Sequence, residues 1–401
     1  GGVEGTITTH LDRRARLAWL GDGWRLDALL QQFQTIDLAI DPLQRPYSRL
    51  PQIAFSGSRR LAGLAASLDA EAAYFDRNAG VTGARLDFAP RLSLPLGGTG
   101  WFLEPAAGWR YTAYELDGLA PGEDRSPTRE APLLSLDAGL LSARRAGGGG
   151  RLPQTLEPRL LYSWIPFRDQ SALPVFDTGL PDLDLVQLFR SNRYVGADRL
   201  GDANQLAIGV TTRLLQTSSG RQYIAATIGQ KIYFESPRVA LGGEVPEQRS
   251  ASDLVGELEV NAFRDWSATV AAQYDADASR TVLARAGVQY RPDPDKVANL
   301  GYRYRAGRVE QWDASAAWRL SERWRVFGRH VHSVRENTGI DSFLGVEYSA
   351  CCWSLRLVGR RYLLNRTGEQ DTSIALQLEL KGLSSVGTTD AFLQRGIRGY
   401  S

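Results

Sequence analysis

The sequence has no uninterrupted run of about 20 apolar residues, the length that a membrane-spanning helix needs. Its mean hydropathy of −0.28 also argues against a helical membrane protein. Basic and acidic residues nearly cancel, at 47 and 45, so the formal charge of +2 gives no bulk attraction to nucleic acid. Cysteine and histidine are scarce, with two and three residues, and methionine is absent. These shortages exclude a helical membrane protein and disfavour a nucleic-acid-binding protein.

Aromatic residues and glycine are abundant, and the apolar residues follow a regular period. The 401 residues include 10 Trp, 15 Tyr, 13 Phe and 41 Gly, a composition that excludes a disordered chain. Leu206, Ile208 and Val210 alternate with more polar neighbours, and this period of two recurs to the end of the chain. We count about 20 such strands of about ten residues, longer than the roughly five or six residues usual in soluble proteins.

The alternation fits two all-β architectures. In a soluble sandwich the apolar face of each strand packs in a core, whereas in an outer-membrane barrel it faces lipid and the polar face lines the lumen. The number of strands favours the barrel, as do Gly and Ala beside Arg and Glu on the polar face. Aromatic residues near strand ends favour it too: Tyr290, Tyr302, Tyr304, Tyr348, Trp353 and Tyr362. The predicted fold class is all-β, a large antiparallel transmembrane β-barrel.

Energetics then assign the strand arginines to one face of the barrel. An arginine on the lipid-facing side costs about 2–4 kcal/mol at the middle of the bilayer, and less near the interfaces. We therefore expect Arg213, Arg285, Arg303 and Arg356 to face the lumen.

The chain is expected to form one β-barrel domain over residues 1–401. Its longer polar interruptions, at 117–131, 144–153, 168–203 and 236–252, separate stretches of similar composition. Segment 168–203 is long for a structureless connection, which predicts a functional loop that lies outside the barrel or dips into the lumen.

Few residues are candidates for chemistry. Cys351 and Cys352 are neighbours, and a disulfide between neighbours needs a strained ring. Either each sulfur pairs with a partner elsewhere, or both are small, half-buried apolar side chains. The spacing of His330 and His332 matches no standard zinc site, and no nucleophile or oxyanion hole accompanies the lone His10. We expect no catalytic residue, no metal, no cofactor and no enzymatic activity.

Several motifs resemble, in their order along the chain, one family of outer-membrane proteins. They lie at 156–170 (LEPRLLYSWIPFRDQ), 188–215, 228–230 with 233–234, 346–348, 351–353 (CCW) and 378–383 (LELKGL). Together they resemble the LPS-assembly outer-membrane protein family, LptD, from Leu156 onward and more loosely before it. A Cys-Cys-Trp followed by this terminal strand is rare, which makes the joint signal specific.

The resemblance implies a barrel of 26 strands that delivers lipopolysaccharide from the periplasm into the outer leaflet. It also implies a small lipoprotein plug, LptE, seated in the lumen. A periplasmic N-terminal jellyroll, which we expect to be absent from this chain, receives lipopolysaccharide from a bridge protein. By the same resemblance, Cys351 and Cys352 form disulfides with two cysteines near that jellyroll. A lateral gate opens between the first and last strands, and the last strand carries Ile374, Leu376, Leu378 and Leu380.

The predicted function is translocation of lipopolysaccharide and its insertion into the outer leaflet of the Gram-negative outer membrane. The saccharide passes through a hydrophilic lumen, and the acyl chains leave sideways through the gate. Two other functions share the composition and the period. An outer-membrane diffusion porin or substrate-specific channel would need neither the lipoprotein nor the cysteines. A soluble all-β binding protein would be soluble without detergent.

Overall fold

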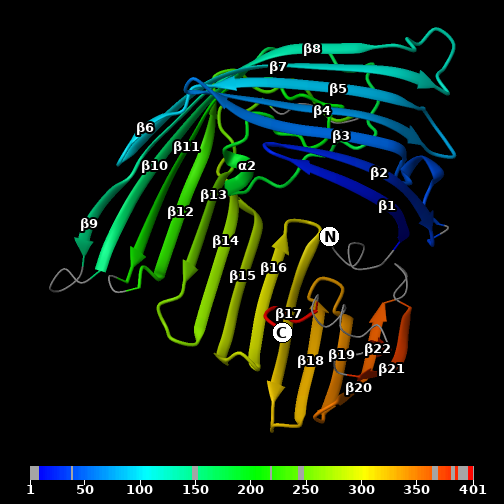
Figure 1. The fold of residues 1–401 in the computed structure, drawn as a ribbon, viewed down its shortest axis with the longest axis vertical. Helices are drawn as coiled ribbons and strands as arrows, with labels where there is room; N and C mark the ends of the chain where they lie inside the picture. Colours follow the sequence, from blue (N-terminus) through cyan, green and yellow to red (C-terminus); the bar gives the residue numbers. More distant parts are fainter. Residues whose placement is uncertain are drawn as a thin grey trace.

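The computed structural model describes residues 9–37, 39–146, 152–216, 219–242, 248–363, 369–380, 384–386 and 396–400. Within these residues, 22 strands form a single antiparallel sheet (Figure 1). The first strands are β1 (His10–Gly21), β2 (Trp24–Thr35), β3 (Ser48–Leu61), β4 (Leu64–Asp76), β5 (Thr82–Ser93), β6 (Leu96–Gly98), β7 (Trp101–Asp117), β8 (Thr128–Leu140), β9 (Ser142–Ala146), β10 (Leu152–Ile165) and β11 (Ala203–Leu215). They are followed by β12 (Gln222–Tyr233), β13 (Leu254–Val260), β14 (Trp266–Asp275), β15 (Arg280–Asp293), β16 (Lys296–Arg305), β17 (Val309–Arg319), β18 (Trp324–Ser333), β19 (Thr338–Ser349), β20 (Trp353–Leu363), β21 (Gln370–Leu380) and β22 (Ser384–Val386). Two short helices, η1 (Pro42–Gln44) and α2 (Leu185–Leu188), interrupt the connections.

Each strand pairs with its neighbours along the chain. β5 and β6 lie end to end beside β7, and β8 and β9 lie end to end beside β10. The 22 strands therefore fill 20 successive positions, which confirms the count expected from the alternation. The 26 strands implied by the resemblance are more than the described residues form. Most strands run over 10 to 17 residues, long enough to cross a bilayer at a tilt.

The connections differ in length at the two ends of the sheet. At one end the turns are tight, and in the hairpin between β3 and β4 both Ala62 and Gly63 have positive φ, at 50° and 88°. A two-residue hairpin that follows the twist of its strands needs such angles. At the other end, the connections 36–47, 166–202 and 234–253 are long. Short turns at one end and long loops at the other are typical of outer-membrane barrels, with the short turns in the periplasm.

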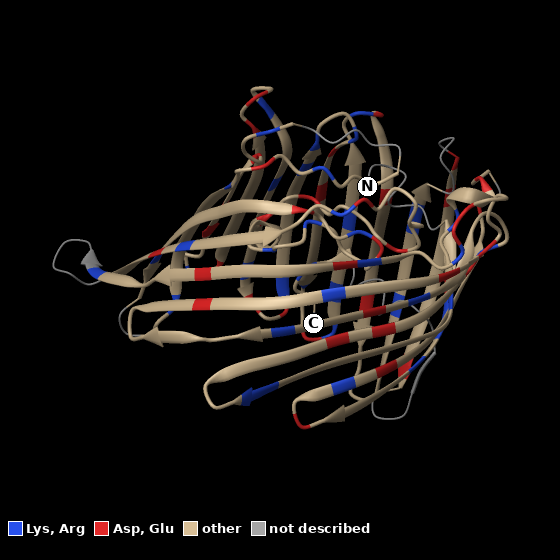
Figure 2. Cartoon of the chain, turned by 90° about the horizontal axis from the view of Figure 1, so that it is seen from above, with Lys and Arg blue, Asp and Glu red and all other residues tan. Residues whose placement is uncertain are grey.

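The sheet curves around an interior (Figure 1). Residues 166–202, here called the inner segment, run inside this curve and contain α2 (Figure 1). Seen from above, the sheet curves around loops that carry charged side chains (Figure 2). Residues 396–400, the C-terminal tail, lie on the concave side of β16–β20. Among the described residues, no ladder joins β1 to β22, so the sheet has two edges there.

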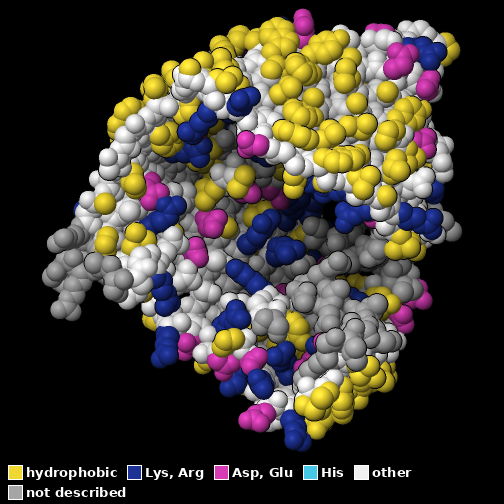
Figure 3. Space-filling view, viewed as in Figure 1, with side chains coloured by type: hydrophobic (Ala, Val, Ile, Leu, Met, Phe, Trp, Pro, Cys, Tyr) yellow, Lys and Arg dark blue, Asp and Glu magenta, His cyan; other side chains and the backbone are white. Residues whose placement is uncertain are grey.

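The two faces of the sheet have opposite character. Large apolar side chains stand exposed on the convex face; Leu300, Leu344 and Ile374, for example, are 58%, 74% and 79% exposed. Apolar side chains cover the outside of β3–β8, and basic side chains gather in the interior that the sheet encloses (Figure 3). A soluble protein keeps such apolar side chains inside, whereas contact with lipid requires them outside. This arrangement confirms the barrel over the soluble sandwich. Within the described residues, no helix is long and apolar enough to cross a membrane.

Aromatic side chains form a belt at the short-turn end of the later strands. The ring of Tyr290 lies 4.5 Å from that of Trp266, and the ring of Tyr348 lies 4.9 Å from that of Trp324 and 5.4 Å from that of Trp353. Such amphipathic rings favour the interface between lipid and water. The belt therefore marks the level at which the periplasmic edge of the bilayer meets the sheet.

Candidate functional site

The inner segment covers the concave face of the first half of the sheet. Its Phe176 stacks on Phe75 of β4 with ring centroids 4.6 Å apart. Its Leu188 is fully buried against Leu161 and Ala207, which belong to β10 and β11. Of the two positions expected for this loop, outside the barrel or within it, the structure shows the one inside the curve. The inner segment and the wall share a small buried apolar core, so the segment is packed against the wall.

A buried cluster of charges also fastens the inner segment to the wall. The guanidinium of Arg85, on β5, donates to Asp198 over 2.5 Å, to Asp177 over 2.7 Å and to Glu71 over 2.6 Å. The side chains of Arg85 and Asp198 are both completely buried. Because buried charges are stable only when they are paired and hydrogen-bonded, these contacts restrain both partners.

Asp198 also organises the backbone of the inner segment itself. Its Oδ2 accepts hydrogen bonds from the backbone N–H groups of Phe176, Asp177 and Thr178, over 2.9–3.2 Å. Arg129 of β8 in turn donates to the backbone carbonyls of Ala197 and Asp198, both over 3.0 Å. One carboxylate therefore links residues 176–178 to residue 198, and the segment to the wall.

The same cluster determines the protonation of Asp177, which lies outside the strands. Burial raises the pKa of its carboxyl, but the hydrogen bonds and charge of Arg85, with the charge of Arg49, outweigh burial. The pKa of Asp177 is thus held below its usual value. The carboxylate stays ionised at neutral pH and keeps its contacts with both arginines.

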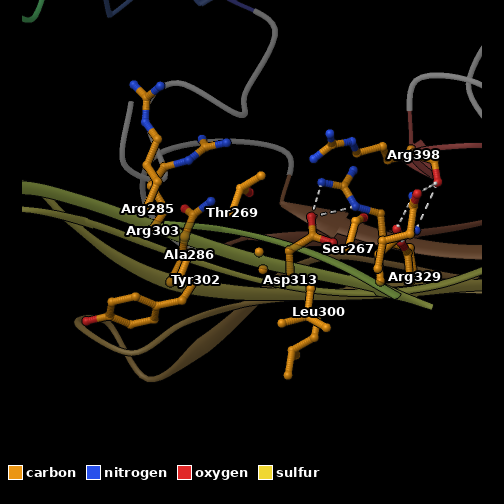
Figure 4. A pocket seen from close by; sticks show the side chains of 18 residues that line it. Ser267, Thr269, Arg285, Ala286, Leu300, Tyr302, Arg303, Asp313, Arg329 and Arg398 are labelled. Carbon is orange, nitrogen blue, oxygen red and sulfur yellow. Dashed lines mark hydrogen bonds and ion pairs between the residues drawn. The ribbon is translucent and has the colours of Figure 1, made fainter. Parts of the chain in front are cut away.

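The concave wall of β14–β18 contains a polar hollow of about 580 Å³ (Figure 4). Arg285 and Arg303 face each other across β15 and β16 at one end of it, and Gln289 and Asn299 do so at the other. Side chains on the opposite face, such as Leu300, point away from the hollow (Figure 4). The hollow is large enough for a small polar group and open to the interior.

All four arginines predicted to face the lumen lie on the concave face. Arg213 pairs with Glu157 of the neighbouring strand, and Arg285 and Arg303 line the hollow. Arg356 is nearly buried and pairs with Glu347. The structure thus places them on one face but not in one cluster, because they are spread over strands from β11 to β20. That this face lines a water-filled lumen stays a prediction.

The C-terminal tail was not anticipated from the sequence. Ile397 is completely buried against Val297, Phe327 and Phe343, which project from the concave wall. The carbonyl oxygen of Arg398 accepts hydrogen bonds from the side-chain amides of Gln289, over 3.2 Å, and of Asn299, over 3.1 Å. The tail therefore forms part of the rim of the hollow.

Cys351 and Cys352 lie in the turn between β19 and β20, at the short-turn end. In a straight strand, neighbouring side chains would point to opposite faces. Instead the chain bends at these residues, so both side chains are exposed, with their sulfur atoms 2.8 Å apart. Their pairing with cysteines of another domain stays a prediction.

The predicted gate residues lie on β21 and project from the convex face. Ile374 and Leu376 are 79% and 64% exposed, and Leu378 and Leu380 follow on the same side of the strand. Among the described residues β21 is followed by a further strand, the three-residue β22, which pairs with residues 378–380. The rest of this edge of β21 has no strand partner within the described part of the chain.

Sequence reasoning missed Arg85 and Asp198, the centre of the buried cluster. Arg85 alternates like any residue of a polar strand face, and its partner lies 113 residues further along the chain. Only the unusual length of the 168–203 connection pointed to this region. No local pattern could have paired the two residues, because they meet only when the sheet curves around the inner segment.

A curved antiparallel sheet with a polar concave face, an apolar convex face and an aromatic belt defines an outer-membrane β-barrel. The family model described as "LPS transport system D", LptD, matches residues 2–324, so the chain belongs to this family. The family description is one of transport and not of catalysis. Membership of this family places the chain in the bacterial outer membrane.

Curated relatives match almost the whole chain, including its first 150 residues. The LPS-assembly protein LptD of Nitrosococcus oceani is 40% identical over 98% of this chain and 54% of its own length. That of Thiobacillus denitrificans is 34% identical over the same shares. The chain thus spans about half the length of the curated relatives that it matches.

Solved structures are similar at much lower identity. The siderophore receptor PirA of Pseudomonas aeruginosa is 12% identical, with a TM-score of 0.46 over 94% of this chain and 70% of its own. The ferric-catecholate import receptor Fiu of E. coli is 10% identical, with a TM-score of 0.44 over 92% and 73%.

Proposed function

We propose that residues 1–401 form the barrel wall along which lipopolysaccharide travels to the outer leaflet of the outer membrane. The single observation that carries the proposal is the sheet of an LptD-family chain with a polar, arginine-bearing concave face and an apolar convex face. Lipopolysaccharide has the same two parts, a charged saccharide and acyl chains. The saccharide follows the concave face, where Arg213, Arg285, Arg303 and Arg356 line the lumen, and the acyl chains move into lipid. No step of this route breaks a covalent bond.

The acyl chains leave sideways along the edge formed by β21. Parting two strands in lipid exposes backbone groups that each cost free energy, so an exit needs a seam with few ladder hydrogen bonds. Among the described residues, only the short β22 pairs with this edge, and it covers residues 378–380 alone. The side chains of Ile374 and Leu376 then line the exit on its lipid side, and Leu378 and Leu380 follow on the same face of β21.

The contents of the interior support guided transport over free diffusion. The inner segment and the C-terminal tail are both packed against the concave face, where an open porin would hold water. A diffusion porin or substrate-specific channel is the alternative function. It predicts steady ion conductance and no requirement for a second protein.

Two partners complete the proposal. A small lipoprotein of the LptE kind sits in the remaining lumen, and a periplasmic bridge protein delivers lipopolysaccharide through an N-terminal domain of the longer protein. Cys351 and Cys352 join the barrel to that domain by disulfides. Their exposure in a short turn supports this role, because short turns face the oxidising periplasm. The driving energy comes from a machine elsewhere.

The test is to extract the tagged full-length protein from outer membranes in mild detergent and identify what copurifies in stoichiometric amount. We expect one small lipoprotein per barrel together with bound lipopolysaccharide. A barrel that purifies alone and conducts ions in a planar bilayer would establish the channel alternative.

The exit is tested separately by site-specific photo-crosslinking in cells. A photoreactive amino acid in place of Leu376 should capture lipopolysaccharide during export. The same amino acid in place of Leu300, equally lipid-facing but in the middle of the wall, is the matched control. Equal capture at both positions would refute an exit at β21.

A further inference from the structure

The floor of the hollow in β14–β18 consists of two glycines that the backbone does not require. Gly287 and Gly301 face each other across β15 and β16, in the middle of both strands. A Cβ on Gly287 would first meet Thr269 Oγ1 at 3.4 Å, and one on Gly301 would first meet the carbonyl oxygen of Asp313 at 3.8 Å. Both distances are ordinary contacts, and neither glycine has positive φ. Glycine weakens a strand interior, and it often marks a place where a ligand approaches closely.

Beside this floor two positive charges face each other. Arg285 and Arg303 are directly opposite in the ladder, and both extend above the wall into the hollow (Figure 4). Like charges at opposed positions destabilise a sheet. Arg303 forms no ion pair among the described residues, and Arg285 has only Asp182 of the inner segment, at 3.9 Å. Within the described part of the chain, the two guanidinium groups therefore lack a matching negative charge, and the glycines leave room for an anion beside them.

The other residues that line the hollow are mostly polar and add little negative charge. The one acidic residue of the lining, Asp313, pairs with Arg329. Arg398 of the C-terminal tail adds a further guanidinium at the rim. Beyond the glycines, the amide N–H groups of Gln289 and Asn299 are engaged with Asn299 Oδ1, Ser315 Oγ and the carbonyl oxygen of Arg398. The Oε1 of Gln289, with no hydrogen-bond partner among the described residues, can accept a hydrogen bond from a sugar hydroxyl.

We propose that this hollow is a binding site for an oxyanion, a phosphate or carboxylate, carried on a saccharide. Arg285 and Arg303 hold the anion above Gly287 and Gly301, and the sugar lies toward Gln289 and Asn299. The proposal rests on the proposed function in one respect, because it makes the anionic groups of the lipopolysaccharide core the natural occupant. The site itself is defined by local geometry and binds independently of export.

The test uses the purified full-length protein with its copurifying partners, in detergent. The probe is the core oligosaccharide released from lipopolysaccharide, with its phosphates intact or enzymatically removed, and inorganic phosphate is measured alongside. The double variant Arg285→Gln/Arg303→Gln removes the charges. Gly301→Val fills the floor without a change of charge. The control Arg264→Gln/Arg280→Gln removes two exposed arginines, one in the turn before β14 and one at the start of β15, and changes the net charge equally.

We expect the phosphorylated oligosaccharide to bind the wild type and the control alike. Its Kd should rise about tenfold or more in both hollow variants, because charge-assisted hydrogen bonds to the anion are lost or blocked. Removal of the phosphates should weaken binding to the wild type to a similar degree.

Four results would overturn the proposal. They are equal binding by all variants, equal loss in the charge-matched control, inorganic phosphate binding as tightly as the oligosaccharide, and loss of the copurifying lipoprotein in Arg285→Gln/Arg303→Gln. The last would mean that an acidic protein side chain fills the hollow. A protein that binds the oligosaccharide here but carries no lipopolysaccharide from cells would refute the transport function and leave the site standing. Equal binding by all variants in a protein that still exports lipopolysaccharide would refute the site alone.

Discussion

Arg85 of β5 and Asp198 of the inner segment form an ion pair, 2.5 Å from Nη1 to Oδ1, in which both side chains are completely buried. The two residues are 113 positions apart in the sequence. In a buried pair, the loss of one partner leaves the other charge without compensation, which costs far more than the pair itself contributes. This pair therefore controls whether the inner segment stays against the wall.

Replacement of Arg85 by methionine should release the inner segment. We expect the docking of residues 166–202 to weaken by about 3–5 kcal/mol, because the buried carboxylates of the cluster lose their cation. Limited proteolysis of the folded barrel should then cut within this segment. Arg91→Met on the same strand is the control, since its half-exposed side chain reaches only Glu104, at 3.4 Å. Equal protection of the segment in both variants would contradict this assignment.

The docking of the inner segment should also depend on pH. The pKa of Asp177 lies below its ordinary value of about 3.9, so its contribution to stability is present above about pH 4 and is lost as the pH falls through the folded-state pKa. We expect the thermal stability of the segment to be constant from neutral pH to about pH 5 and to fall in stronger acid. Asp177→Asn, which cannot ionise, should have lower stability at pH 7 and a flatter acid profile. A profile as steep as that of the wild type would assign the acid response to other carboxyls.

Truncation of Ile397 should free the C-terminal tail. Ile397→Ala removes a fully buried side chain from the cluster with Val297 and Phe327, and such losses cost about 2–5 kcal/mol. Because the tail contacts the wall through this small cluster and not through a strand ladder, we expect its local release without unfolding of the barrel, seen as faster limited proteolysis within residues 396–400. Arg398→Ala is the control, since its side chain is exposed and its backbone carbonyl makes the hydrogen bonds. Similar cleavage rates for the two variants would show that Ile397 does not anchor the tail.

An arginine scan of β13 should distinguish its two faces. Leu258, 40% exposed on the convex face, is adjacent to Glu257, which projects from the concave face at nearly the same depth. Leu258→Arg should destabilise the barrel in lipid by about 2–4 kcal/mol at the bilayer midplane, whereas Glu257→Arg should have a much smaller effect. Denaturant unfolding of the protein in lipid vesicles measures both. Equal effects would mean that the convex face of β13 does not contact lipid.

Much of the wall could be predicted because its signal is local. The alternation around Leu206 and Val210 decides which side chains face lipid, since a shift of one residue would move every apolar side chain into the interior. The same argument placed Arg285 and Arg303 on the concave side, where the structure has them. The turn that holds Cys351 and Cys352 was not predicted, because a two-residue bend leaves no trace in a period of two.

The sequence by itself determined the fold class, the number of strands to within the scatter of the count, the faces of the strands and the family. These follow from hydrophobic periodicity and from motifs within single strands, which need no knowledge of distant residues. Only the tertiary structure decided that the inner segment docks inside the curve through Arg85 and Asp198, and that Ile397 returns to the wall. It also decided that Gly287 and Gly301 leave a hollow beneath two arginines. Each of these depends on curvature and register, which bring together residues that the chain keeps far apart.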